Sequence, residues 1–405
     1  MPQFRQDVSK ERHSDAFTLS TNYSAVQTNL SIVSNPGRHK SIILTDLIVS
    51  NGDTAGYVTL AEDTNVQKTV ITQRLNLAIN GLLRTNFSNG LALTPNTDLG
   101  FTSSTTDDLS LTLNYLIENV ITFGYTSGGH TNSLDATIDK MSFNSNANST
   151  GVGDITQASY GVTGQSSTIN GYASGGYYSA VNSNIINKFS FATSGNAADM
   201  ANLTVARYAP AGQSSTVSGY TAGGHSGANS LIVDKFSFTS DGNASLVGDL
   251  TLARYLASGQ SSSTYGYTCG GYTGSYQSTM DKSSFSSDSD SSSVGDLPAE
   301  LSATAGQQST ENGYTSGGSS GTKSQAINKF SFASDGDAAI NADLTIARSN
   351  ACGQSSLNYG YTSGGVSSSN QVTAHIDKFS FASDEKAAQV GILTVARYNA
   401  SGQQS

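Results

Sequence analysis

One phrase occurs six times in the C-terminal part of the chain, and its spacing limits the fold more than any other feature. The phrase opens with Gly-Tyr, and successive copies lie 47, 48, 47, 47 and 47 residues apart, starting at Gly124, Gly171, Gly219, Gly266, Gly313 and Gly360. The 282 residues from Gly124 to Ser405 equal six periods of 47. A fixed period of about 20 to 50 residues is typical of solenoids, propellers and other repeat arrays.

Each unit contains four phrases. The first is Gly-Tyr-Thr-Ser-Gly-Gly, as at 313–318, and the second is an alternating run, as at 231–238. The third is Leu-Thr-x-Ala-Arg, as at 203–207, and the fourth ends in Gly-Gln-Ser-Ser, as at 212–215. Period-2 alternation and short apolar phrases between turn residues predict one strand from each phrase. Four short strands predict a propeller blade, and six blades close a ring.

The glycine pairs and the end of the chain predict how the ring is built. We expect the paired glycines to adopt positive φ and to allow close backbone approach where the blades converge. In the other units a Gly-Tyr follows the Gly-Gln phrase seven residues later, as from Gly164 to Gly171, but Gly402-Gln403 runs into Ser405. We therefore expect this last phrase to pair with 123–128 and to close the ring.

The phrases "GYTSGG" and "LTVAR", with an aromatic strand between them, resemble the kelch repeat, which has a Gly-Gly doublet, a Tyr-containing strand and a Leu-Pro-x-x-Arg phrase. The fourth unit keeps Leu297-Pro298, and the resemblance covers 121–405. The chain departs from the kelch pattern in having no Trp, so Phe-x-Phe pairs such as Phe189 and Phe191 must fill the space differently. The resemblance implies a six-bladed kelch-like β-propeller closed by its C-terminal strand.

The N-terminal part is predicted to form a polar arm at 1–20 and a β-sandwich at 21–120. Alternating runs at 41–49, 57–62, 74–79 and 109–117 are typical of a small, jelly-roll-like sandwich. The segments "ILTDLIVSNGDTAGYVTLAED" and "LALTPNTDLGFTSSTTDDLSLTLNYLIEN" resemble a sandwich module of tailed-phage virion proteins, over about 25–120. That resemblance implies a docking module, often trimeric, that anchors a protein to a capsid or tail. A soluble sandwich without this role is the alternative.

Composition and charge exclude several classes of function. Residues 1–120 carry 8 Lys and Arg against 11 Asp and Glu, and residues 121–405 carry 12 Lys and Arg against 19 Asp and Glu. Because acidic residues outnumber basic ones in both parts, neither part is suited to binding a phosphate backbone, and we expect no nucleic-acid partner. No apolar run approaches the 18 residues or so of a membrane span, and 1–16 lack a signal-peptide core. We therefore expect no membrane span and no Sec export.

Chemistry-bearing residues do not converge on an active site. Five His residues lack metal-ligand spacing, and no nucleophile elbow, phosphate loop or Cys-His pair stands in a suitable context. We expect no enzyme activity, no cofactor and no metal, with calcium at acid-rich turns such as 286–296, or a carboxylate pair between blades, as alternatives. Cys269 and Cys352 are interpreted as small buried fillers, with a disulfide as the alternative.

Ten of the twelve cations after residue 120 occupy two repeat slots: Lys140, Lys188, Lys235, Lys282, Lys329 and Lys378, and Arg207, Arg254, Arg348 and Arg397. We interpret them as structural residues that bind backbone carbonyls or carboxylates such as Asp234; a ligand-binding ring of positive charge is the alternative.

Ligand contacts are instead expected in the divergent loops after Gly-Gly, which are rich in Asn, Ser, Thr and Tyr. The candidate ligand-binding residues are Tyr177, Tyr178, Tyr272, Tyr276, His130 and His225, suited to stacking on glycans.

These features favour a bacteriophage virion structural protein that displays its propeller on the particle surface. The N-terminal domain is expected to bind other capsid or tail proteins, and the chain is expected to form a homo-oligomer, a trimer. The propeller is expected to decorate the particle or to bind host-surface glycans. An intracellular kelch-type adaptor that binds a protein partner is the second hypothesis. A carbohydrate-active propeller enzyme is the third.

Overall fold

The computed structural model describes residues 123–405 continuously and, of residues 1–122, only ten β-strands. The chain divides into two compact units, 1–121 and 122–405. The described residues form an all-β structure, and no helix long and apolar enough to cross a membrane occurs among them.

The described strands of the first unit form two antiparallel sheets. One has the order β1-β2-β10-β4-β8, and the other has the order β3-β9-β5-β6 with β7 paired to β5. The predicted sandwich core, and the residues of the predicted arm outside β1 and β2, lie outside the described residues. The strands are β1 (Asp7–Ser9), β2 (Asp15–Tyr23), β3 (Leu30–Val33), β4 (Lys40–Ser50), β5 (Gly56–Asp63), β6 (Lys68–Val70), β7 (Leu75–Leu77), β8 (Leu82–Ala92), β9 (Asp98–Ser103) and β10 (Leu109–Asn119).

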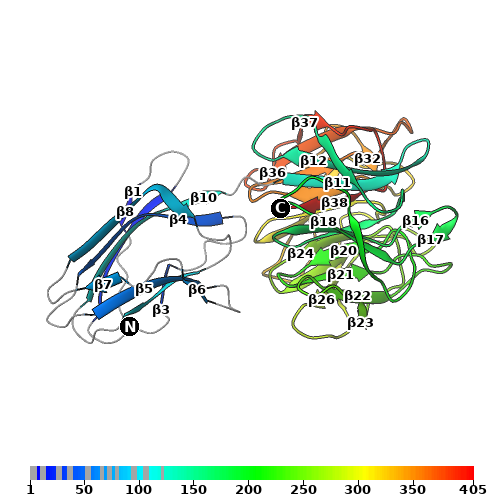
Figure 1. The fold of residues 1–405 in the computed structure, drawn as a ribbon. Helices are drawn as coiled ribbons and strands as arrows, with labels where there is room; N and C mark the ends of the chain where they lie inside the picture. The colour runs from blue at the N-terminus through cyan, green and yellow to red at the C-terminus, as the bar shows by residue number, and fades with distance from the viewer. Residues whose placement is uncertain are drawn as a thin grey trace. The chain divides into compact units, whose positions relative to one another are not determined.

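The second unit is a six-bladed β-propeller, and each blade is a four-stranded antiparallel sheet (Figure 1). We number the blades 1 to 6 by their Gly-Tyr strands. From the axis outward they are: blade 1, β38 (Ser401–Gln404), β11 (Phe123–His130), β12 (Leu134–Ser142), β13 (Thr150–Asp154); blade 2, β14 (Thr163–Ser166), β15 (Asn170–Ser174), β18 (Ile185–Ser190), β19 (Ala198–Asn202); blade 3, β20 (Ala211–Ser214), β21 (Ser218–Ala222), β22 (Ile232–Ser237), β23 (Ser245–Asp249). The others are: blade 4, β24 (Ser258–Ser261), β25 (Tyr265–Cys269), β26 (Thr279–Ser284), β27 (Ser292–Asp296); blade 5, β28 (Ala305–Gln308), β29 (Asn312–Ser316), β30 (Ala326–Ser331), β31 (Ala339–Asp343); blade 6, β33 (Cys352–Ser355), β34 (Tyr359–Ser363), β36 (His375–Ser380), β37 (Ala388–Ile392). Two further short pairs are β16 (Tyr177–Tyr178) with β17 (Val181–Asn182), and β32 (Arg348–Ser349) with β35 (Val366–Ser367).

The predicted closure of the ring is confirmed. The C-terminal β38 is the inner strand of blade 1 and pairs with β11, with Gly124 opposite Gln404 and Ser127 opposite Ser401. Figure 1 shows these two strands, from opposite ends of the second unit, side by side. Blade 1 therefore holds both ends of the propeller.

The prediction of the third strand was wrong. The Leu-Thr-x-Ala-Arg phrase forms a loop, and the outer strand of each blade lies just before it, as β23 lies before Leu250. The residues of β23 and β27 are exposed or only partly buried, so these strands carry little apolar pattern. The phrase is apolar because Leu250 and Arg254 turn into the junction between blades, where both are buried.

Glycine brings the six inner strands together at the axis. A Cβ atom on Gly259 would lie 2.1 Å from the carbonyl oxygen of Gly212, and the same conflict recurs from each inner strand to the next. The Gln that follows reaches across the junction, as Gln213 Nε2 donates to the carbonyl of Tyr267 at 3.0 Å. The predicted role of the glycine pairs is also confirmed, since Gly175 and Gly176 have φ of 69° and 108°.

Aromatic side chains fill the spaces between blades in place of the missing Trp. Tyr172 of blade 2 stacks on Phe238 of blade 3 at 4.8 Å between ring centroids, and Phe236 packs on the same ring at 5.4 Å. Equivalent contacts join Tyr267 to Phe330 and Phe332. Each blade thus buries its apolar face against the next one, as a single blade could not do alone.

Candidate functional site

A closed ring of backbone hydrogen bonds shapes one end of the propeller axis. One residue from the loop before each inner strand has φ between 52° and 66°, and its N–H donates to the carbonyl of the equivalent residue in the previous loop at 2.7 to 2.9 Å. The ring residues are Gly161, Ala209, Leu256, Ala303, Asn350 and Asn399, and the cycle closes from Gly161 N to Asn399 O. Six loops are therefore held rigidly around the axis. We call this end of the propeller the loop face.

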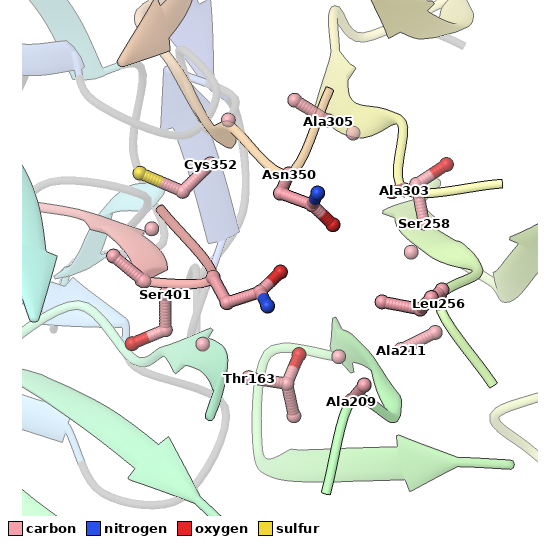
Figure 2. Close-up of a pocket in the computed structure, with 18 of the residues that line it drawn as sticks. Thr163, Ala209, Ala211, Leu256, Ser258, Ala303, Ala305, Asn350, Cys352 and Ser401 are labelled. Carbon is pink, nitrogen blue, oxygen red and sulfur yellow. The ribbon is translucent and has the colours of Figure 1, made fainter. Parts of the chain in front are cut away.

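A cavity of about 120 Å³ lies on the axis and is lined by this ring and the first residues of the inner strands. Figure 2 shows Leu256 and Asn350 pointing toward its centre. Two hydroxyl groups in its wall are already bonded, since Ser401 Oγ donates to the carbonyl of Ser127 and Thr304 Oγ1 contacts Ser258 Oγ. Pockets that bury a drug-sized ligand measure roughly 300 to 1,000 Å³, so this cavity suits only a few small molecules such as water.

A continuous series of aromatic rings runs part of the way around this end of the axis. Two slots contribute eight of the rings, namely the residue after Gly-Gly and the residue after the Arg slot, and these slots meet at each junction between blades. The ninth ring, Tyr276, lies four residues after Tyr272. Along the series, neighbouring ring centroids lie 5.3 to 5.9 Å apart, and every ring is partly exposed. We call it the aromatic arc; in spatial order its members are Tyr398, His130, Tyr160, Tyr177, Tyr208, His225, Tyr255, Tyr272 and Tyr276.

The backbone of the junctions does not require these rings. Between blades 2 and 3, Tyr208 and His225 exchange two backbone hydrogen bonds of 3.1 and 2.9 Å. Between blades 4 and 5, Ser302 and Ser319 exchange the same two bonds at 3.0 and 2.9 Å. Four junctions carry the arc and two do not, although the backbone pairs in the same way at all six.

The structure brings together five of the six predicted ligand-binding residues. His130, Tyr177, His225, Tyr272 and Tyr276 are members of the aromatic arc. Tyr178 lies in β16 opposite Val181 and makes none of the ring contacts of the arc. Sequence reasoning missed Tyr160, Tyr208, Tyr255 and Tyr398, although a Tyr after the Arg slot in four of six units was a visible signal.

Buried ion pairs lie at four junctions between blades. Arg207 contacts Asp234 of the next blade at 3.0 Å, and both side chains are 0% exposed. Burial lowers the pKa of Arg207, and the Asp234 carboxylate partly offsets this effect. The same pairing joins Arg254 to Asp281, Arg348 to Asp377 and Arg397 to Asp139. The structural interpretation of the Arg slot is thus confirmed, because these guanidinium groups are out of reach of a ligand.

The other two junctions have lost both charges together. Between blades 1 and 2 the slots hold Ser159 and Asn187, and between blades 4 and 5 they hold Leu301 and Asn328. These two junctions are opposite each other in the ring. The propeller is therefore two halves of three blades, each held internally by ion pairs, that meet at uncharged junctions. The Asp is present only at the junctions that also have the Arg, because a buried charge without a partner is strongly destabilising.

The Lys slot lies nearer the surface. Lys188, Lys235 and Lys282 pair with Asp241, Asp288 and Asp335 of the next blade at 2.6 to 3.0 Å. Lys140 and Lys378 instead lie 3.9 and 4.0 Å from the ring centroids of Phe123 and Tyr359. These contacts agree with a structural role for the slot.

Neither a disulfide nor a metal site emerges from the described side chains. Cys269 and Cys352 are free and buried, as the filler interpretation predicted. Burial raises the pKa of the Cys269 thiol, which donates to Gln260 Oε1. In residues 123–405, no three His, Cys, Asp or Glu side chains come close enough together to hold a metal ion.

The fold and the site together define a six-bladed β-propeller with an aromatic surface on its loop face. The chain matches no family model, and no curated protein matches it.

Proposed function

We propose that the protein is a bacteriophage virion protein whose propeller binds host-surface glycans through the aromatic arc. The arc supports this proposal because Ser302 and Ser319 carry the same backbone bonds without rings, so the rings are not needed for the scaffold. Partly exposed Tyr side chains combine a flat apolar face with a polar hydroxyl, which suits sugar rings. A row of such sites suits weak, multivalent binding to a polymer.

The charge of the loop face favours a neutral ligand. The Arg residues below the arc are fully buried. The loop segments that carry the arc contain few charged residues. One of them, Asp135, contacts Arg397 at 3.2 Å. A site for carboxylated or phosphorylated glycans would need exposed Lys or Arg for charge-assisted hydrogen bonds. We therefore propose neutral polysaccharide as the ligand class.

Attachment to the particle is the second part of the proposal. The N-terminal sequence resembles a virion docking module, and it would leave the propeller free for display. Oligomerisation as a trimer would multiply the weak contacts of each propeller.

Glycan binding can be tested with the full-length protein and three variants. Tyr208→Ala and Tyr255→Ala should weaken retention on neutral host polysaccharide, whereas Tyr359→Ala, away from the arc, should not. Retention that is the same for all three variants would contradict the arc as the binding surface. Gold-labelled antibody against residues 121–405, applied to purified particles, tests display, and particles without label would contradict the virion assignment.

A further inference from the structure

The junction between blades 1 and 2 differs from the other five on the loop face. Like the junction between blades 4 and 5, it lacks the ion pair, since Ser159 and Asn187 occupy those slots. Only blade 2 carries the β16–β17 hairpin. The turn of this hairpin consists of Ser179 and Ala180, with φ of 43° and 66°. Two-residue hairpin turns of this kind favour Gly, Asn or Asp, so the chain maintains a strained turn here.

Three polar atoms near this junction are buried without a hydrogen-bond partner among the described residues: His130 Nδ1, Gln157 Oε1 and Asn182 Oδ1. Buried polar groups are almost always bonded, so each such atom calls for an explanation. The slot of Gln157 is apolar in the other five units, with Val205, Leu252, Ala299, Ile346 and Val395. A glutamine at this one position is therefore not required by the blade architecture.

The segments that carry these atoms converge on two rings of the arc. Asn182 pairs with Tyr177 across the hairpin, and Tyr177 exchanges backbone hydrogen bonds of 2.8 and 3.2 Å with Tyr160. The His130 ring lies 5.7 Å from the Tyr160 ring. Gln157 precedes Tyr160 in the same loop. His130, Gln157 and Asn182 are each partly exposed, so a change of rotamer can turn the three atoms toward a ligand.

We propose that this junction is the specificity subsite of the aromatic arc and holds one neutral sugar unit. The sugar ring stacks on Tyr160 or Tyr177, and its hydroxyl groups donate to Gln157 Oε1, Asn182 Oδ1 and His130 Nδ1. The segments 155–161, 177–183 and 130–134 contain no Lys, Arg, Asp or Glu, which favours hydroxyl groups over charged substituents. This inference rests on the proposed glycan binding and assigns its selectivity to one junction.

The test compares full-length variants for binding to neutral oligosaccharides of glucose, galactose, mannose and N-acetylglucosamine, each with one to six units. Gln157→Val places in blade 1 the residue that the same slot has at Val205, and Asn182→Ala removes the second acceptor. Each should weaken binding of the preferred oligosaccharide about tenfold, the effect of one lost hydrogen bond to a buried group. Leu252→Val, in the same slot at the junction between blades 3 and 4, should leave affinity within about twofold.

The outcomes separate the two proposals. Neither Gln157→Val nor Asn182→Ala should lower the thermal unfolding midpoint substantially, because each removes an unbonded polar atom. If the wild-type protein binds an oligosaccharide and both variants bind it equally well, the subsite is overturned while glycan binding stands. If the wild-type protein binds none of the oligosaccharides, glycan binding fails and this inference fails with it. If Leu252→Val lowers the affinity as much as Gln157→Val and Asn182→Ala do, the subsite is also overturned, because selectivity then does not depend on the junction between blades 1 and 2.

Discussion

The paired loss of Arg and Asp at two junctions predicts the outcome of a double-mutant cycle at a third. At the junction between blades 3 and 4, Arg254 contacts Asp281 at 3.1 Å, and both side chains are 0% exposed. Leu301 and Asn328 occupy the same two slots between blades 4 and 5. The variants are Arg254→Leu, Asp281→Asn and the double variant, which copies that uncharged junction.

Each single substitution leaves one buried charge without its partner and should lower the free energy of unfolding by about 3 to 5 kcal/mol. Asp281 would keep its two hydrogen bonds from Thr251, at 2.9 and 2.6 Å, but would lose the guanidinium. The double variant removes both charges and should lose only about 1 to 2 kcal/mol, since uncharged residues in both slots leave no buried charge without a partner. Nε and Nη1 of Arg254 have no partner among the described residues, so little bonding is lost with them.

Urea unfolding of the full-length protein, followed by circular dichroism, measures these differences in unfolding free energy. The control is Lys235→Leu with Asp288→Asn, which removes a partly exposed pair 3.0 Å apart and should change stability by less than about 1 kcal/mol. If the losses from the two single variants add up to the loss from the double variant, the ion pair is not the coupled unit. The reasoning from Leu301 and Asn328 would then be refuted.

Three further perturbations test the architecture. Gly259→Ala should prevent the ring from closing, because its Cβ atom would lie 2.1 Å from a carbonyl oxygen. The control is Gly242→Ala, whose Cβ atom meets no atom within 4 Å. A folded Gly259→Ala variant with an unchanged melting midpoint would contradict this prediction. Deletion of 400–405 removes the inner strand of blade 1, which pairs with β11 at four positions. The free energy of unfolding should fall by at least about 4 kcal/mol, at about 1 kcal/mol per hydrogen bond. Limited proteolysis and thermal unfolding would detect this loss. Burial raises the pKa of Tyr125 and Tyr267 from 10.0 to about 12. The unfolded chain therefore releases these protons first, so stability is complete below pH 10 and falls as the pH rises toward 12; a constant unfolding free energy across that window would refute it.

Much of the propeller could be predicted because repeats report architecture directly. The period, the glycine pairs and the orphan phrase at Gly402 specify six blades and their closure, since each unit must bury its faces on the next. The outer strand could not be found in the same way. The residues at 245–249 are exposed or partly buried and show little apolar alternation, whereas the loop from Leu250 to Arg254 resembles a strand in the sequence because Leu250 and Arg254 are buried.

The candidate site could likewise be predicted only in part from the sequence. The divergent loops pointed to Tyr177 and Tyr272, because variable positions on a repeated scaffold stand out in the sequence. Their neighbours Tyr160 and Tyr255 occupy a slot that holds Tyr in four of the six units, so they do not stand out as variable positions. Ring contacts across a junction join residues about 17 positions apart on different blades, and the spacing of the sequence does not reveal them.

The sequence by itself determined the number of blades, the strand that closes the ring and the slots where Arg and Asp occur, because these follow from the period and from residue chemistry. Only the tertiary structure decided which slots meet. It joined each Arg to the Asp of the next blade, placed the two uncharged junctions opposite each other, and brought nine partly exposed rings into one arc. Contacts between blades depend on the distance of closest approach across a junction, and that distance is set by the packing of six inner strands on glycine at the axis.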